Sequence, residues 1–142
     1  MCSSDLPLLA MLRGIPESLG EHRYGPGKWT LKESLLHVTD AERVFCYRLL
    51  RIARGDTTPL PGFDQDVWVP NCDVSGRTVA SLVDELAAVR AATQTLVDSL
   101  SDAAWTRRGT ASGKEISARA LVWIIAGHAA HHLTIFRDKY LS

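Results

Sequence analysis

The sequence has little of what several classes of protein require. It contains only three cysteines, Cys2, Cys46 and Cys72, and no CxxC pair. An odd number of cysteines without that spacing argues against a disulfide framework and is typical of a reducing compartment. The opening stretch MCSSDLPLLAMLRG also lacks the basic region and long apolar run of a signal peptide. We therefore expect a cytoplasmic protein.

An excess of charge and a membrane-spanning run are missing as well. Sixteen lysines and arginines balance sixteen aspartates and glutamates, so the formal net charge is zero. Proteins that bind nucleic acid usually carry a basic excess, and we expect no nucleic-acid partner. The apolar run ALVWIIAG is too short to span a bilayer, so we expect no membrane segment either.

What the sequence does contain is a strong helical pattern. Its 142 residues, 46% of them hydrophobic, are enough for one domain with a full core, and we predict a single domain over residues 1–142. Apolar residues recur at helical spacing, with almost no strand pattern. The predicted helices cover residues 4–13, 30–54, 78–100 and 117–140, with a short apolar turn at 16–19. This predicts an all-α protein, a four-helix bundle.

The second predicted helix has the clearest boundaries. It begins with TLKE, in which Thr30 and Glu33 have the spacing of a capping box. Gly55 stands where a helix commonly ends. An inward-facing stripe is predicted from a seven-residue repeat of Leu31, Val38, Phe45 and Ile52.

We make three further predictions, two for the connections between helices and one for the last helix. Residues 56–77 are rich in proline and glycine, so we expect a long connection without a regular element, of the length usually reserved for function. Residues 107–115, RRGTASGKE, read as a polar loop. The last helix is apolar on nearly every side over residues 118–130, which predicts a central position in the fold.

Three histidines interrupt this last apolar segment, in the stretch IIAGHAAHHL. His128 and His132 are four residues apart and therefore share one helix face, whereas His131 lies at its edge. An unpaired polar group in a core costs about 1–3 kcal/mol. The two rings could be satisfied by backbone carbonyls and carboxylates, or together by a metal ion, since neutral imidazole is the commonest metal ligand.

A third ligand would come from another helix. His37, in ESLLHVTDAERV, lies about two turns into the second predicted helix and is the natural candidate. Asp64 and Asp66, in the long connection, could orient a ligating imidazole or a bound water. Loop solubility or helix capping explains these two aspartates equally simply. We expect Glu42 to pair with an arginine instead of acting as a ligand.

Three stretches together resemble one known family. GKWTLKESLLHVTDAERV, LPGFDQDVWVP and IAGHAAHHLTIFRDKYL are similar to segments of the DinB/YfiT-like superfamily. The resemblance implies a four-helix bundle of DinB type with a long connection between the second and third helices. It also implies that His37, His128 and His132 hold a divalent transition metal, which is zinc, nickel, iron or manganese in members of the family. Many members are homodimers, and some transfer a low-molecular-weight thiol.

The function expected from these features is that of a metal-dependent enzyme of the thiol S-transferase or hydrolase type. It would activate a low-molecular-weight thiol or water for transfer to a small electrophilic substrate, with His131, Asp64 and Asp66 as supporting residues around the ligands. One alternative is a non-enzymatic, metal-binding stress-response bundle that acts through a protein partner or as a homodimer. Another is a structural dimer with buried histidines and no metal.

Overall fold

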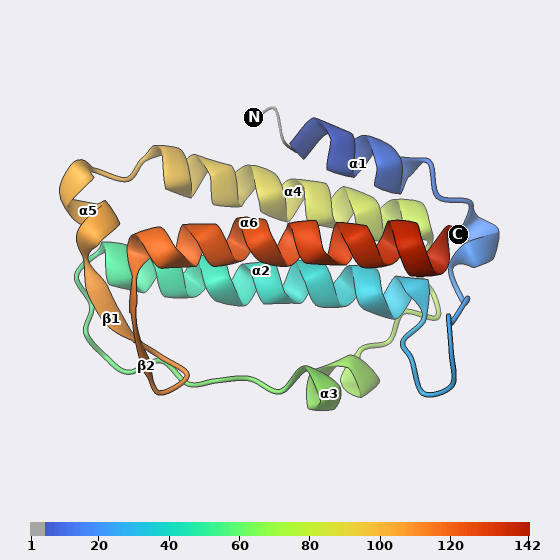
Figure 1. Ribbon diagram of the computed structural model, residues 1–142, viewed down its shortest axis with the longest axis horizontal. Coiled ribbons are helices and arrows are strands. Elements are labelled where there is room, and N and C mark those ends of the chain that lie inside the picture. Colours follow the sequence, from blue (N-terminus) through green and yellow to red (C-terminus); the bar gives the residue numbers. More distant parts are fainter. Residues whose placement is uncertain (1–4) are drawn as a thin grey trace.

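The protein folds as a four-helix bundle (Figure 1). The computed structural model describes residues 5–142, with side chains from Leu8 onward. Cys2 lies outside the described residues, and so does Ser4, at which we predicted the first helix to begin. The bundle helices are α1 (Asp5–Arg13), α2 (Leu31–Ala53), α4 (Val79–Asp98) and α6 (Ala118–Ile135). Helix α2 packs against both α4 and α6, and α1 packs against α4. The predicted all-α bundle is therefore confirmed.

Helix α2 is fixed at its start by the predicted capping box. The Thr30 hydroxyl accepts a hydrogen bond from the Glu33 amide at 3.1 Å, and the Glu33 carboxylate accepts one from the Thr30 amide at 2.7 Å. At the other end Gly55 has a φ of 82°, a left-handed conformation that glycine adopts without steric cost. His37 thus lies two turns from a firmly capped helix start.

Helices α2 and α6 run antiparallel, so the start of α2 lies beside the end of α6 (Figure 1). One apolar cluster joins these two ends with α1 and the start of α4, and it includes Leu31, Leu35, Val83 and Phe136. A second cluster at the opposite end of the bundle includes Leu49, Ile52, Leu121 and Ile125. This antiparallel packing brings His37 to the level of the last histidines of α6.

The predicted polar loop over residues 107–115 is wrong, because a small hairpin follows the short helix α5 (Asp102–Thr106). Strands β1 (Arg108–Ala111) and β2 (Lys114–Ser117) pair antiparallel. Ser112 and Gly113, with φ values of 52° and 74°, form the two-residue turn that suits a hairpin. Ala111 is its only buried strand residue, and it pairs with Leu60 of the long connection. With so little apolar surface to bury, the strands show no alternating pattern.

The long connection is also more ordered than predicted. It contains helix α3 (Gln65–Trp68) and a 3-10 turn, η2 (Val69–Asn71), although we expected no regular element over residues 56–77. Asp64 caps α3 by accepting a hydrogen bond from the Asp66 amide at 2.9 Å. Pro70 stands in the first positions of the 3-10 turn, where its missing N–H costs no hydrogen bond. Buried Val69 and Leu60 hold the connection to the bundle.

Helix α6 is not enclosed on every side, contrary to the prediction from its apolar sequence. The Trp123 side chain is 73% exposed and Ile124 is 40% exposed, because the neighbouring helices cover only the opposite face. After Ile135 the chain continues in a π-helical turn, η3 (Phe136–Tyr140), where we predicted a regular helix. In the part of the chain that the structure describes, no helix combines the length and apolarity needed to cross a bilayer.

Candidate metal centre

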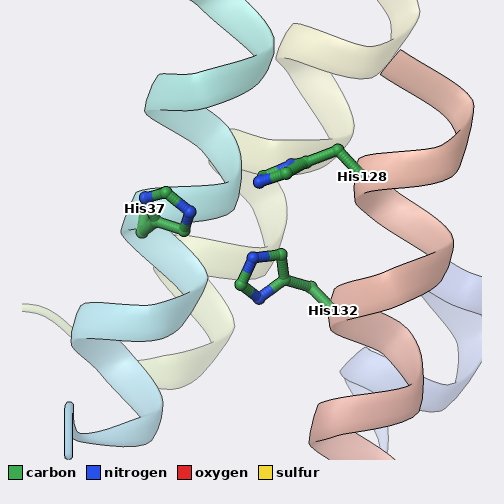
Figure 2. A group of neighbouring side chains, drawn as sticks. All are labelled: His37, His128 and His132. Carbon is green, nitrogen blue, oxygen red and sulfur yellow. The ribbon is translucent and has the colours of Figure 1, made fainter. Parts of the chain in front are cut away.

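The structure brings the three predicted ligands together between α2 and α6 (Figure 2). His37 projects from α2 toward His128 and His132, which lie one turn apart on α6. The nitrogen atoms that could bind an ion all lie within 4.8 Å of one another. The ring centroids are 4.6 Å apart for His128 and His132, and 5.0 and 5.2 Å from His37 to His132 and His128. We call this group the histidine triad.

All three rings are poor bases in this setting. Burial, and after it the charges of the neighbouring imidazoles, lowers the pKa of His132 to about 3 and that of His128 to about 4. Burial also lowers the pKa of His37, against the opposing charge of Asp66. Near neutral pH the triad therefore presents lone pairs and no positive charge, which is the state in which imidazole binds a metal ion.

The donor set fits a divalent metal ion. His132 is 8% exposed, and its Nδ1 atom is buried without a hydrogen-bond partner among residues 5–142. A buried polar atom of this kind is unfavourable unless something outside the described chain completes it. Three imidazoles supply three ligands, so a tetrahedral or larger shell around an ion here would need further ligands.

Aromatic side chains enclose the triad. The Trp29 ring lies 4.9 Å from the His37 ring, and the Phe45 ring lies 5.4 Å from the His128 ring. Phe136 contacts His132 at a centroid distance of 6.3 Å. These neighbours cover part of the triad and restrict the rotation of the imidazoles, so the ligand atoms are held facing one another.

A pocket of about 410 Å³ opens onto the His128 and His132 side of the triad. Its walls come from the segment before α2, from α3 and from the end of α6. Besides His128 and His132, they include Tyr24, Gly27, Lys28, Trp29, Ser34, Gln65, Asp66, His131, Ile135 and Tyr140. The pocket thus reaches a group of metal-type ligands through walls that carry hydroxyl, amide, ammonium and carboxylate groups.

The residues predicted to support the ligands divide into two groups. Asp66 and His131 line the pocket, and the His131 ring lies 5.3 Å from that of His132. Asp64 is not among the lining residues, because its side chain caps α3. Glu42 pairs with Arg90 at 2.8 Å, as predicted, and is not part of the triad.

Lys28 and Tyr140 also line the pocket, and neither was among the predicted site residues. A signal for Tyr140 was present, since His132, Phe136 and Tyr140 recur at four-residue intervals, the spacing of neighbours on a helix surface. No spacing marks Lys28, which lies in the irregular segment before α2.

Comparisons with known proteins agree with this architecture. The solved structure of YfiT from Bacillus subtilis, described as a probable metal-dependent hydrolase with an unusual four-helix bundle topology, superposes with a TM-score of 0.73. The two sequences are 20% identical, and the match covers 92% of this chain and 81% of YfiT, so it establishes a common fold. No curated protein sequence matches the chain. The sequence model of the DinB superfamily matches residues 7–136, and the chain belongs to that superfamily.

Proposed function

We propose that His37, His128 and His132 bind one divalent transition metal ion. The observation that carries this proposal is the unsatisfied, buried Nδ1 atom of His132 within a cluster of neutral imidazoles. Zinc, nickel, iron and manganese are the candidate ions, because imidazole suits several first-row metals and cellular supply selects among them. Three protein ligands leave coordination positions free, as in catalytic sites, whereas structural zinc sites are closed by four.

We further propose that the protein is a metal-dependent enzyme acting on a small electrophilic substrate. When bound, a divalent ion would lower the pKa of a coordinated water or low-molecular-weight thiol. The chain supplies the pocket, in which Asp66 can accept a hydrogen bond and Lys28 can bind an anionic group. The fold shared with YfiT, which is described as a probable hydrolase, supports water as the nucleophile; thiol transfer is the second candidate.

The pocket also bears on the alternative, a metal-binding bundle without catalytic activity. A protein that only binds a metal ion needs ligands that close the coordination shell and no path for a substrate. A pocket of about 410 Å³ that leads to the ligands gives a substrate access to them, and this observation favours an enzyme. Within that pocket, we propose that Asp66 and His131 support the ligands, whereas Asp64 contributes by capping α3.

Metal analysis of purified, tag-free protein tests the site. Wild type is expected to hold about one ion per chain, His128→Ala to hold little, and the control His22→Ala, an exposed histidine before α2, to match wild type. Metal content unchanged in His128→Ala would refute the ligand assignment. Turnover of ester, amide and epoxide panels, with and without thiols, then separates hydrolysis from thiol transfer, and no turnover in any panel would favour the non-enzymatic alternative.

We also propose that the protein forms a homodimer through the exposed face of α6. Between Arg119 and Arg137 the helix carries no charged residue, and Trp123 and Ile124 project from it. A charge-free helix face with an exposed tryptophan has the composition of an interface core. Sedimentation analysis is expected to give a dimer for wild type and a monomer for Trp123→Glu; a wild-type monomer would refute the proposal.

A cytoplasmic location is proposed from the thiols. Cys46 and Cys72 are both free, which is common where the cell keeps thiols reduced. Cell fractionation in the source organism tests this, and recovery from an extracytoplasmic fraction would contradict it.

A further inference from the structure

The end of α6 is joined to the residue that precedes α2 by one long-range hydrogen bond. The Tyr140 hydroxyl donates to the Trp29 carbonyl at 2.7 Å, across 111 positions of sequence. Tyr140 is only 4% exposed, and burial raises its pKa to about 12, so the phenol keeps its proton and remains a donor. The bond therefore links the end of α6 to the start of α2, the two helices that carry the triad, and both of its residues line the pocket.

Trp29 connects this bond to the triad. It stands immediately before the N-cap residue Thr30, and its indole ring packs on the His37 ring at a centroid distance of 4.9 Å and an interplanar angle of 48°. Aromatic pairs at this distance have a preferred geometry, so the position of the indole restricts the angle of the imidazole. The position of the indole depends in turn on a backbone that Tyr140 holds through its carbonyl.

Tyr140 is the last residue of the π-helical turn η3, which follows α6. His132, Phe136 and Tyr140 follow one another at four-residue intervals, and their rings form a row with centroid distances of 6.3 and 5.9 Å. The turn over Phe136–Tyr140 departs from regular α-helix directly after the segment with the ligands. Isolated π-helical turns are rare and occur frequently at functional sites.

We propose that Tyr140 and Trp29 are positioning residues that fix the orientation of the His37 imidazole. The proposal rests on the metal site proposed above and adds to it residues that do not themselves bind the ion. A ligating histidine is commonly oriented by a hydrogen bond from its second nitrogen, and loss of such a partner costs about 10- to 100-fold in metal affinity. Here the indole packed on His37 performs the orienting role, and the Tyr140 hydroxyl holds the Trp29 backbone from which the indole projects.

Tyr140→Phe tests this with a small change, because it keeps the ring and removes the hydroxyl that donates to the Trp29 carbonyl, together with that hydroxyl's interaction with Ser34. The matched control is Tyr24→Phe, since Tyr24 also lines the pocket and contacts the Tyr140 ring at 5.0 Å but is not that donor. Affinity for zinc is measured in the full chain by competition with a chromogenic chelator, together with the visible spectrum of the cobalt-loaded protein. Tyr140→Phe is expected to bind about tenfold more weakly and to shift the cobalt bands, whereas Tyr24→Phe matches wild type.

A readout without metal keeps this proposal separate from the metal site itself. In metal-free protein, the NMR signals of the His37 ring carbons and protons are expected to shift in Tyr140→Phe but not in Tyr24→Phe, because the ring current of Trp29 moves with its backbone. If wild type binds no metal, the metal site fails while this shift still tests the positioning. Wild-type affinity, cobalt spectrum and His37 signals in a folded Tyr140→Phe protein would overturn the proposal, even if its Tm falls.

A second variant covers the case in which Tyr140→Phe does not fold. Trp29→Phe keeps an aromatic ring beside His37 but changes its size, and it leaves the carbonyl that accepts from Tyr140 in place. It is expected to give a smaller loss of zinc affinity than Trp29→Ala, with the cobalt spectrum shifted in the same direction in both. Identical wild-type affinities and spectra in the two Trp29 variants would contradict the positioning role.

Discussion

Two groups of buried polar side chains lie close together on α2, and they are satisfied in opposite ways. Glu42 pairs with Arg90 of α4 at 2.8 Å, with side-chain exposures of 3% and 11%. One turn earlier on α2, His37 meets two further imidazoles that have the same charge state and the same chemistry as itself. The first group thus contains its own counter-charge, whereas the second consists only of lone-pair donors.

The difference separates structure from function inside one helix. A buried ion pair compensates its desolvation within the protein, so Glu42 and Arg90 join α2 to α4 without outside help. In the triad, the buried Nδ1 atom of His132 has no hydrogen-bond partner among residues 5–142, and a pocket leads there from the surface. A partner from solution is therefore expected for the triad and is unnecessary for the ion pair.

The largest expected effect comes from breaking the ion pair. Glu42→Gln leaves the Arg90 charge buried, which costs about 3–5 kcal/mol of stability. Urea unfolding measures the loss, and the control Asp84→Asn, which breaks an exposed pair with Arg13, is expected to cost less than about 1 kcal/mol. Folded Glu42→Gln protein should keep its metal. Loss of the ion in this variant would show that the two groups are one unit.

Metal removal is expected to have the next largest effect, and it concerns the triad alone. A ligand that binds only the native state stabilises it by about 2.7 kcal/mol when its free concentration is a hundred times Kd. A chelator should therefore lower the Tm of wild type and Glu42→Gln alike, while leaving His37→Ala unchanged. An equal drop in His37→Ala would place the ion elsewhere.

The pH dependence of metal-free protein probes the triad without its ion. The folded pKa values of His128 and His132, about 4 and about 3, lie below the unfolded value near 6.5. Well above pH 6.5 both histidines are neutral in the folded and the unfolded state. As the pH falls from 6.5 toward 4, only the unfolded chain gains protons, so stability falls by about 1.4 kcal/mol per pH unit for each histidine.

Unfolding free energies of the metal-free protein at pH 7 and pH 5.5 measure this slope. Wild type is expected to lose about 2 kcal/mol in total, and His128→Gln about half as much because one titrating group is gone. Equal slopes in the two proteins would show that His128 titrates normally in the folded state.

The smallest expected effect concerns the pocket wall. Asp66→Asn removes the carboxylate whose charge opposes the lowered pKa of His37. Metal affinity is expected to fall by about tenfold, the lower end of the range for residues that support a ligand. Asp64→Asn, which retains an acceptor for capping α3, serves as the control and should bind metal normally. A larger loss in Asp64→Asn would contradict this division of roles.

Much of the fold follows from local signals in the sequence. The capping box at Thr30 and the glycine at position 55 fix α2 to within a residue, because both act through backbone geometry in one turn. The four-residue spacing of His128 and His132 places them on one helix face before any packing is known. The meeting of His37 with this pair depends on the antiparallel packing of α2 and α6. The residues alone made His37 the natural third ligand, and the family resemblance implied the full set.

The remaining features depend on contacts between distant segments. The hairpin buries little beyond Ala111, so its strands have no alternation to detect. The spacing of apolar residues does not predict the exposed face of α6 at Trp123, because the identity of an apolar residue does not tell whether another helix or solvent lies opposite it. Tyr140 donates to a carbonyl 111 residues away in the sequence, and no local pattern encodes that bond.

The central claim is that the triad holds a metal ion, and one diffraction experiment tests it most directly. Crystals of tag-free wild-type protein, with anomalous data collected on both sides of the absorption edges of zinc, nickel, iron and manganese, would locate and identify any bound ion. The account predicts one anomalous peak within bonding distance of one nitrogen each from His37, His128 and His132, with further positions open to the pocket. Ordered imidazoles with no peak between them, or with water alone, would contradict it.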